Sequence, residues 1–247
     1  MVLLAVLAHP DDESMGTGGT LFRHAAAGIE VHLVCATRGD QGWQGKPPGA
    51  TKEDLPRIRT GELQAAAAVL GLAGVELWDY PDGGVPGCDQ AEITARIAES
   101  VQRLRPVAVI GWGPDGGYGH PDHIAVGACT DAAVRSIDPS ARPALYHLAL
   151  DEDLAQAYRE VMALSGDDEV LPVEIQPDVG PVLELSDEEV RAKMRAIDCH
   201  ASQLEDWCIA IRDLPDLVAR TYGREPYVPI SSGTRALDER GLLAELA

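Results

Sequence analysis

Two short polar motifs in this sequence carry the side chains that bind transition metals. His9 and Asp12 lie three residues apart after an apolar run, and His123 lies in a second motif further along the chain. Two imidazoles and one carboxylate leave coordination positions open for water and substrate, as in catalytic metal sites. The set suits Zn²⁺ and also Fe²⁺, so the sequence predicts an open metal site without deciding between these metals.

Each histidine has a simpler explanation when it is taken alone. His9 could be a packed residue at a strand end, and His120 and His123 could cap or solvate a helix. However, both motifs have the form His-Pro-Asp followed by Asp or His: His9-Pro10-Asp11-Asp12 and His120-Pro121-Asp122-His123. This shared form favours the metal site.

Two further residues of these motifs are candidates for proton transfer. Asp11 adjoins Asp12 and could take a proton from a metal-bound water, as a general base does in metal-assisted hydrolysis. The alternative for Asp11 is a turn or helix-capping aspartate. His120 lies three residues before His123 on the same helical face. It could donate a proton or stabilise an oxyanion, or it could simply bind a backbone carbonyl.

Alternating strands and helices must position these motifs. Apolar runs predict strands, and helical patterns follow them; the expected strands are 1–8, 29–37, 75–78 and 107–112, and the expected helices are 20–27, 55–70, 90–104 and 120–137. Residues 16–19 are expected to form a glycine-bearing turn. The alternation predicts an α/β fold, a Rossmann-like and largely parallel sheet with helices on both faces.

The polar clusters at 9–13, 38–42 and 113–123 each follow a predicted strand. They should therefore meet at the carboxyl edge of the sheet, where α/β folds place functional loops. No internal repeat is present, so one domain over 1–247 is expected, with a core at 1–150 and a C-terminal part at 151–247. That part should hold a helix-and-loop excursion at 151–180. A capping-box helix should then run from Ser186 to about His200 and close the fold.

Charge and apolar runs exclude several classes of partner. Twenty basic residues against 40 acidic ones give a net charge of −20, which repels nucleic-acid and lipid phosphates.

Residues 1–8 pass directly into the His9 motif, which indicates a strand rather than a signal peptide, and no apolar run approaches the ~20 residues of a membrane span. Five scattered cysteines without a CxxC pair predict neither disulfides nor a zinc ribbon. A cytoplasmic protein that acts on small molecules and could form a homo-oligomer is expected.

The order of the motifs resembles the PIG-L/LmbE-like metal-dependent N-deacetylases. The resemblance covers residues 1 to about 150 and resumes at 193–203. It rests on these segments: Ala8 to Glu13, Gly18-Gly19-Thr20, Thr37-Arg38-Gly39, Arg59 with Glu62, Leu70-Gly71, Asp82-Gly83, Gly116 to His123, and Lys193 with Ala196 and His200 to Gln203. The pairing of AHPDDE with HPDH is the most specific part of this pattern.

The resemblance implies a role for each matching position. His9, Asp12 and His123 match the zinc ligands of the family, and Asp11 matches its general base. Tyr118 and His120 match residues that polarise the acetyl carbonyl and stabilise the tetrahedral intermediate. Arg59 and Asp82 match residues that hold sugar hydroxyls; taken alone, they would be a helix charge and a turn aspartate.

Three residues outside this set are expected to be structural. Glu13 should organise its loop by hydrogen bonding. His200 and Gln203 should hold the C-terminal helix against the sheet; the alternative is that they line the site.

The expected activity is zinc-dependent hydrolysis of the N-acetyl group of an acetamido sugar, or of a related small glycoside or amine, with Fe²⁺ as the other possible metal. A thiol-conjugate amidase of the mycothiol type is the first alternative. A non-catalytic small-molecule-binding module is the second. The first turn lacks the GxGxxG pattern of dinucleotide-binding folds, which argues against the second alternative.

Overall fold

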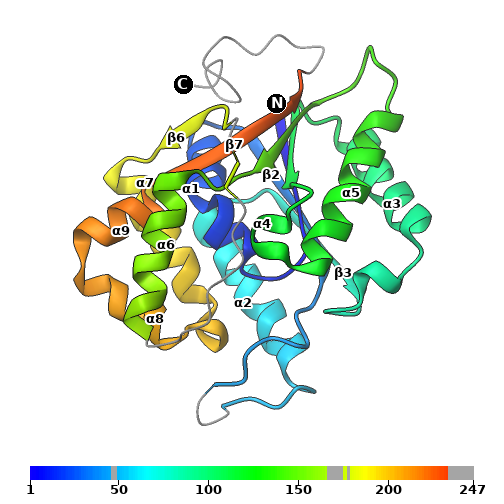
Figure 1. Ribbon diagram of the computed structural model, residues 1–247. Helices are drawn as coiled ribbons and strands as arrows, with labels where there is room; N and C mark the ends of the chain where they lie inside the picture. Colours follow the sequence, from blue (N-terminus) through cyan, green and yellow to red (C-terminus); the bar gives the residue numbers. More distant parts are fainter. Residues whose placement is uncertain (46–48, 166–174, 177–178, 233–247) are drawn as a thin grey trace.

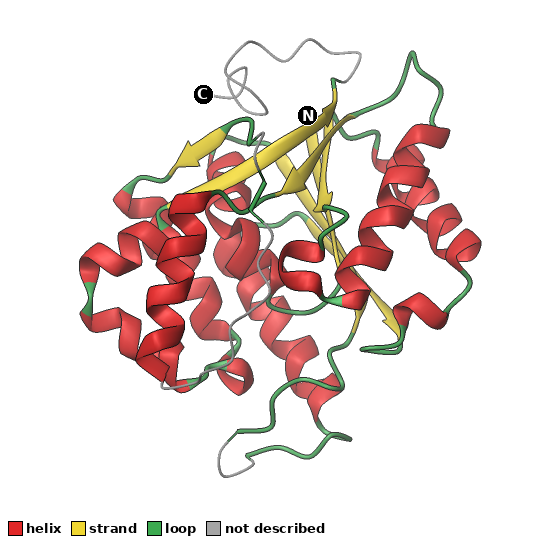
Figure 2. Ribbon diagram, viewed as in Figure 1, coloured by secondary structure: helices red, strands yellow, loops and turns green. Residues whose placement is uncertain are grey.

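A mostly parallel sheet runs through the middle of the molecule (Figures 1 and 2). The computed structural model describes residues 1–45, 49–165, 175–176 and 179–232. Within them the strand order is β3-β2-β1-β4-β5-β7-β6. The strands are β1 (Val2–Leu7), β2 (Glu30–Thr37), β3 (Gly74–Tyr80), β4 (Ala108–Trp112), β5 (Ala144–Leu148), β6 (Val182–Glu184) and β7 (Arg224–Ser231).

The first five strands pair in parallel, whereas β7 runs antiparallel to β5 and β6 antiparallel to β7. The predicted Rossmann-like α/β fold is confirmed. Strand β1 explains why the prediction succeeds. Its residues from Leu3 to Leu7 are buried, because a central parallel strand is covered on both faces and therefore forms a continuous apolar run.

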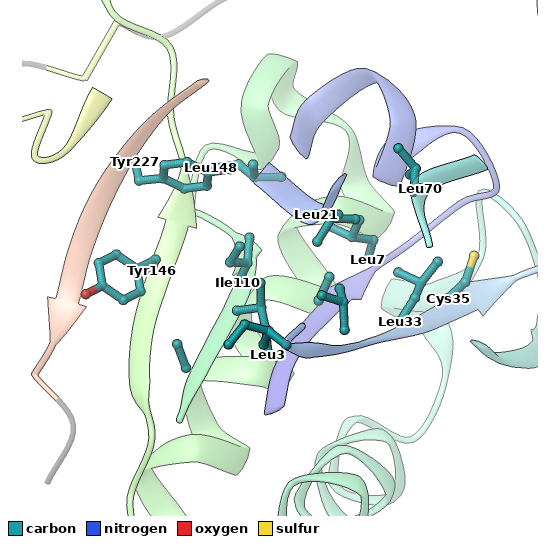
Figure 3. Packing of buried hydrophobic residues seen from close by; sticks show 14 of the residues in the cluster. Leu3, Leu7, Leu21, Leu33, Cys35, Leu70, Ile110, Tyr146, Leu148 and Tyr227 are labelled. Atoms are coloured by element: carbon teal, nitrogen blue, oxygen red, sulfur yellow. The ribbon is translucent and has the colours of Figure 1, made fainter. Parts of the chain in front are cut away.

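Helices cover both faces of this sheet. On one face, α1 (Asp12–Ala26), α2 (Leu55–Leu70) and α7 (Asp187–Cys199) pack on Leu3 and Leu7, as Figure 3 shows for Leu21 and Leu70. On the other face, α3 (Gln90–Leu104) and α5 (Pro121–Ser136) pack on Leu4 and Val6. The alternating side chains of β1 thus supply both cores.

The C-terminal part adds a layer of helices beside α7. It contains α6 (Glu152–Ser165), α7, η2 (Ala201–Gln203), α8 (Asp206–Ala210), η3 (Ile211–Asp213) and α9 (Pro215–Tyr222). A separate apolar cluster joins α6, α7, η3 and α9. The capping box at Ser186 is confirmed, since its hydroxyl and the Glu189 carboxylate each accept the other residue's backbone N–H. Of the expected excursion, residues 166–174 and 177–178 lie outside the described part.

The start of the first helix differs from the prediction. Residues 16–19 are not a turn, because α1 already begins at Asp12 and runs through them with one kink at Thr17. The glycines allow close packing instead. A Cβ atom on Gly19 would overlap the side chain of Leu185, and one on Gly18 would lie 3.3 Å from Cγ of Lys193. These glycines therefore let the segment that leads into α7, and α7 itself, approach α1.

Among the described residues, no helix is long and apolar enough to cross a membrane. All five cysteines are free thiols in this structure.

A matched pair of glycine substitutions tests the packing of α5 on β4. A Cβ atom on Gly127 would overlap the backbone carbonyl of Trp112, whereas one on Gly61 in α2 would meet nothing within 4 Å. We expect Gly127→Ala to destabilise the fold by about 1–3 kcal/mol, since backbone must move. Gly61→Ala should stabilise it by roughly 0.5–1 kcal/mol through helix propensity. Urea unfolding of both variants checks this, and equal shifts would contradict the packing described.

Candidate active site

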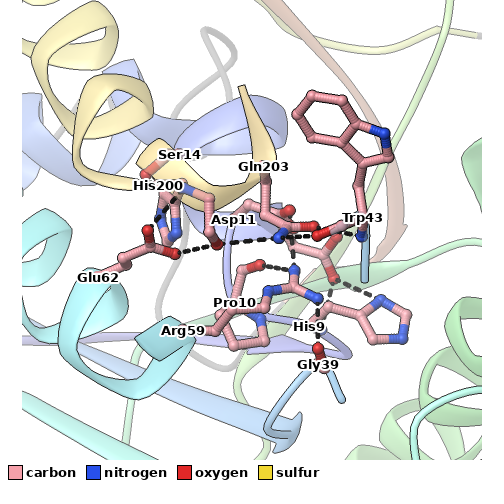
Figure 4. A network of polar contacts seen from close by, with 12 residues as sticks. His9, Pro10, Asp11, Ser14, Gly39, Trp43, Arg59, Glu62, His200 and Gln203 are labelled. Carbon is pink, nitrogen blue, oxygen red and sulfur yellow. Dashed lines mark hydrogen bonds and ion pairs between the residues drawn. The ribbon is translucent and has the colours of Figure 1, made fainter. Parts of the chain in front are cut away.

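The polar clusters that follow the parallel strands meet at one edge of the sheet, as predicted. Arg59 shows the convergence most directly (Figure 4): its guanidinium donates to the carbonyl of Gly39 at 2.9 Å, to that of Pro10, and to the carboxylate of Asp11 at 2.9 Å. Across the site, Nδ1 of His9 lies 3.1 Å from Nε2 of His123. Residues more than 110 positions apart thus share one site.

Neighbouring groups orient both imidazoles. Nε2 of His9 lies 3.0 Å from Oδ1 of Asp82 and 3.1 Å from Oδ2 of Asp122, so it carries the proton and leaves Nδ1 facing the site. Nδ1 of His123 donates to the carbonyl of Gly116 at 3.0 Å, which leaves Nε2 facing the site. Burial lowers the pKa of His9, but its hydrogen bonds to Asp122 and Asp82 outweigh this and raise it to about 10, so a metal that bound Nδ1 would have to displace a proton from it.

Asp12 offers one carboxylate oxygen to the site and has the other held in place. Oδ2 accepts the backbone N–H groups of Ala8 at 3.0 Å and His9 at 2.9 Å, and the indole N–H of Trp112 at 3.3 Å. Oδ1 lies 3.4 Å from Nε2 of His123. Burial raises the pKa of Asp12, but the neighbouring His123 and His9 lower it well below its usual range. Asp12 is therefore a carboxylate near neutral pH.

Two sets of side chains among the described residues lie close enough to share a metal ion. They are His9, His120 and His123, and His9, Asp82 and Asp122. Asp12, the third predicted ligand, belongs to neither set, although its carboxylate lies 3.9 Å from Nδ1 of His9 and 3.4 Å from Nε2 of His123. Nδ1 of His120 is not available to a metal, since it accepts the backbone N–H of Asp122 at 3.2 Å and caps α5. The donor chemistry suits a divalent metal: ligand atoms around a tetrahedral ion with bonds of ~2.0–2.1 Å lie ~3.3 Å apart. The His9–His123 and His123–Asp12 distances are close to that value.

Asp11 is held in a strained backbone conformation at the start of α1. Its φ of 110° lies in the left-handed region that non-glycine residues avoid, which costs energy that surrounding contacts must offset. Its backbone N–H donates to Glu13 at 3.0 Å, and its carboxylate pairs with Arg59. Burial raises the pKa of Asp11, and Arg59 opposes this rise. These contacts hold the strained backbone in place, and they thereby fix the direction of the Asp11 carboxylate beside the candidate ligands.

Tyr118 and His120 stand next to the two facing imidazoles. The ring of His120 lies 4.6 Å from that of His9 and 4.7 Å from that of His123, and the ring of Tyr118 lies 5.3 Å from that of His123. Burial and nearby carboxylates raise the pKa of Tyr118, so its phenol keeps its proton. Burial and the neighbouring imidazoles lower the pKa of His120. A phenol donor and a neutral imidazole are both available here.

Arg59 and Asp82 already form several contacts within the protein, although they were predicted to bind sugar hydroxyls. Arg59 is 3% exposed, and both of its terminal nitrogens are bonded within the protein. Asp82 contacts His9 through Oδ1 and accepts the backbone N–H of Gln41 at 2.8 Å through Oδ2. In this structure the two residues contact His9 and Asp11, and their role toward a substrate stays a prediction.

Two residues of the site were not singled out by the sequence reasoning. Asp122 has a fully buried side chain and accepts the backbone N–H groups of Gly83 at 2.7 Å and Val85 at 3.0 Å besides contacting His9. Trp112 stacks on His123, with ring centroids 4.0 Å apart and an angle of 11°. The position of Asp122 within the second His-Pro-Asp motif could have indicated its role from the sequence. For Trp112, the only indication was its position at the end of a predicted strand.

The expected structural residues tie the C-terminal part to the site. Oε1 of Glu13 pairs with Nε2 of His200 at 2.7 Å, and both side chains are buried. Gln203 bonds the backbone of Trp43 in both directions, at 3.0 and 3.1 Å, so it also holds the loop after β2. Glu13 and His200 thus join the end of α7 to the start of α1, and both His200 and Gln203 also line the cavity described next.

A cavity of about 380 Å³ opens beside these groups. Asp11, Asp12 and Tyr118 line it at the sheet edge, and the rest is lined by residues of α1, by the ends of β4 and β5, and by the C-terminal part. A cluster of titratable side chains next to a cavity of this size is typical of a small-molecule binding site.

Fold and site together define an α/β protein with a candidate metal-dependent hydrolytic centre, and comparison with known proteins agrees. Residues 4–134 match the PIG-L family, described as GlcNAc-PI de-N-acetylase. The chain is 34% identical, over 82% of its length and 68% of the relative's, to the 1D-myo-inositol 2-acetamido-2-deoxy-alpha-D-glucopyranoside deacetylase of Kineococcus radiotolerans. The chain belongs to the PIG-L family.

Solved structures share the fold at lower identity. The N,N'-diacetylchitobiose deacetylase from Pyrococcus horikoshii matches with a TM-score of 0.65 at 22% identity, over 93% of this chain and 83% of that one. GalB, the 4-carboxy-2-hydroxymuconate hydratase from Pseudomonas putida KT2440, matches with a TM-score of 0.67 at 23% identity, over 93% and 96%. These similarities concern the fold, since it hosts both a deacetylase and a hydratase.

Removing one partner of the Glu13–His200 pair should destabilise the protein. His200→Ala leaves a buried carboxylate without its main counter-charge, and we expect a loss of about 3 kcal/mol or more in urea unfolding. His200→Gln keeps a hydrogen-bond donor and should lose less. The control is Arg220→Ala, which breaks a solvent-exposed pair with Glu160 and should leave the midpoint nearly unchanged. Equal midpoints for His200→Ala and Arg220→Ala would contradict this role.

Proposed function

We propose that the protein is a metal-dependent N-deacetylase that hydrolyses an acetamido sugar or a related small glycoside or amine. One observation carries the proposal: the facing nitrogens of His9 and His123, 3.1 Å apart, lie beside the carboxylates of Asp11 and Asp12 in a PIG-L family chain. The deacetylase names of its relatives supply the substrate class.

His9, Asp12 and His123 would hold the metal, with Zn²⁺ the first candidate and Fe²⁺ the second. Nδ1 of His9, Nε2 of His123 and Oδ1 of Asp12 are the atoms that the hydrogen bonds of these residues leave turned to the site. A bound metal would polarise the acyl carbonyl and lower the pKa of a bound water toward ~7. The carboxylates of Asp82 and Asp122 behind His9 orient its ring, as outer partners of metal-bound histidines do.

The protein's own residues divide the proton transfers. Asp11 takes a proton from the attacking water, because its fixed carboxylate adjoins Asp12. Tyr118 donates a hydrogen bond to the carbonyl oxygen as that oxygen gains charge, which its protonated phenol allows. Asp11 or His120 then protonates the amine nitrogen, because an amide nitrogen does not leave as an anion near neutral pH. Acetate and the free amine are the products.

Removing the proposed base should stop turnover without removing the metal. We expect Asp11→Asn to lower kcat by about 10²–10⁴, the usual contribution of a general base. The measurement is amine release from N-acetylglucosaminyl substrates, together with the metal content of the purified variant. Asp138→Asn, in a surface turn, is the matched control and should keep full activity. Full turnover by Asp11→Asn with metal bound would refute the assignment.

Removing a ligand should instead empty the site. Wild-type protein should carry about one transition-metal ion per chain, and His123→Ala should carry far less. Elemental analysis after dialysis gives the count. Chelation should abolish activity, and added zinc or ferrous iron should restore it in the wild type. His32→Ala in β2 is the control, because His32 contacts Glu30 away from the site and should not change the metal content.

A further inference from the structure

The cavity beside the candidate active site is much larger than an acetyl group requires. Its volume of about 380 Å³ lies within the ~300–1,000 Å³ typical of pockets that bury a whole small molecule. An acetyl group places only one methyl beyond its carbonyl carbon. Most of the cavity would stay unfilled if that methyl were its only occupant.

The walls of the cavity are mainly apolar. Past Asp11, Asp12 and Tyr118, apolar side chains form much of the lining, and they come from α1, from β5 and the loop after it, and from α6 and α7: Met15, Leu148, Leu150, Leu154 and Ile197. Polar residues, among them Gln203 and Thr221, line another part. The apolar part offers little to the hydroxyl groups of a sugar. It suits a hydrocarbon chain, whose burial is favourable in proportion to its area.

The charged groups that reach the cavity are already paired. Lys193 Nζ lies 2.7 Å from Glu225, and Arg224 Nη2 lies 2.7 Å from Asp151. An anionic occupant would have to compete with these carboxylates. Three buried polar atoms of lining residues, His200 Nδ1, Thr221 Oγ1 and Arg224 Nε, have no hydrogen-bond partner among the described residues. The apolar part of the cavity, which Leu148, Leu154 and Ile197 line, therefore suits a neutral chain better than an anion.

The polar side of the site lies elsewhere. Arg59 and Asp82 do not line the cavity, and neither do residues 39–41, which form polar contacts with them. The cavity is therefore formed by other residues than the polar loops around Arg59 and Asp82.

We propose that this cavity is an acyl-chain subsite, so that the protein hydrolyses N-acyl amino sugars whose acyl group is a chain of medium length, longer than acetyl. The inference rests on the proposed function, because it uses the same hydrolytic centre. Water adds across the amide C–N bond; the acyl carbon gains oxygen and leaves as a carboxylic acid, and the nitrogen leaves as the amine with the proton supplied by Asp11 or His120.

A substrate series tests the subsite directly. We compare kcat/KM for glucosamine carrying N-acetyl, N-butanoyl, N-hexanoyl and N-octanoyl groups, with amine release as the readout. Each buried methylene can contribute about fourfold, so we expect at least a roughly tenfold rise from acetyl to hexanoyl. A control substrate, octyl N-acetylglucosaminide, carries the chain on the sugar side of the amide instead. If acetyl is the best acyl group, or if only the octyl glycoside gains, the proposal is overturned.

A pair of tryptophan substitutions in α6 localises the effect. Leu154 lines the cavity, whereas Leu164 in the same helix is 47% exposed and does not line it. We expect Leu154→Trp to lower the hexanoyl-to-acetyl ratio of kcat/KM at least roughly tenfold, because the larger side chain occupies the volume of the chain. Leu164→Trp should leave the ratio unchanged. Equal ratios in the two variants, both confirmed as folded by their melting temperatures, would overturn the assignment.

A binding arm separates this inference from the proposed function. Octanoate and acetate are titrated against the wild type and the two variants by calorimetry. Tighter binding of octanoate that Leu154→Trp removes would support the subsite even if no amine were released, an outcome that would refute the deacetylase alone. Turnover of the N-acetyl substrate without preference for longer chains, and without octanoate binding, would refute the subsite alone.

Discussion

The buried carboxylate of Asp122 joins three strand ends into one site. It accepts two backbone N–H groups from the turn after β3, contacts the His9 imidazole after β1, and is itself carried on the first turn of α5 after β4. A carboxylate without water around it must find such donors, because leaving it unpaired is costly. That requirement sets the position of His9, and through His9 the spacing to His123. The candidate metal site therefore depends on a residue that need not touch the metal.

Much of the fold and site could be predicted because the signals are local. The apolar run of β1 and the His-Pro-Asp motifs are read within a few residues, and parallel pairing then forces the strand ends together. The glycines of α1 misled the prediction, since they serve contacts with Leu185 and Lys193 rather than a turn. Strands β5, β6 and β7 were not predicted; β6 is short, and β7 contains two prolines, which weaken a strand pattern. The cavity was out of reach, because it arises from contacts between segments distant in sequence.

The fold alone does not decide the chemistry. Structures named as a deacetylase and as a hydratase match this chain equally well, so the argument for hydrolysis depends on particular side chains and on family membership. The strained Asp11 is the most informative of them. A non-glycine residue at a φ of 110° persists only when its surroundings hold it there, and here the contacts of Glu13 and Arg59 do so.

The Glu13–His200 pair has a consequence for how the protein becomes active. Glu13 adjoins the candidate ligand Asp12, yet its partner lies 187 residues later in the chain. A ribosome releases the motif from His9 to Glu13 long before it releases the helix that completes the surroundings of that motif. The sheet of β1 to β5 can pair early, but the loop that carries Asp11 gains its last buried partner only when α7 docks against α1. Catalytic competence should thus be a late event in folding, later than formation of the parallel sheet itself.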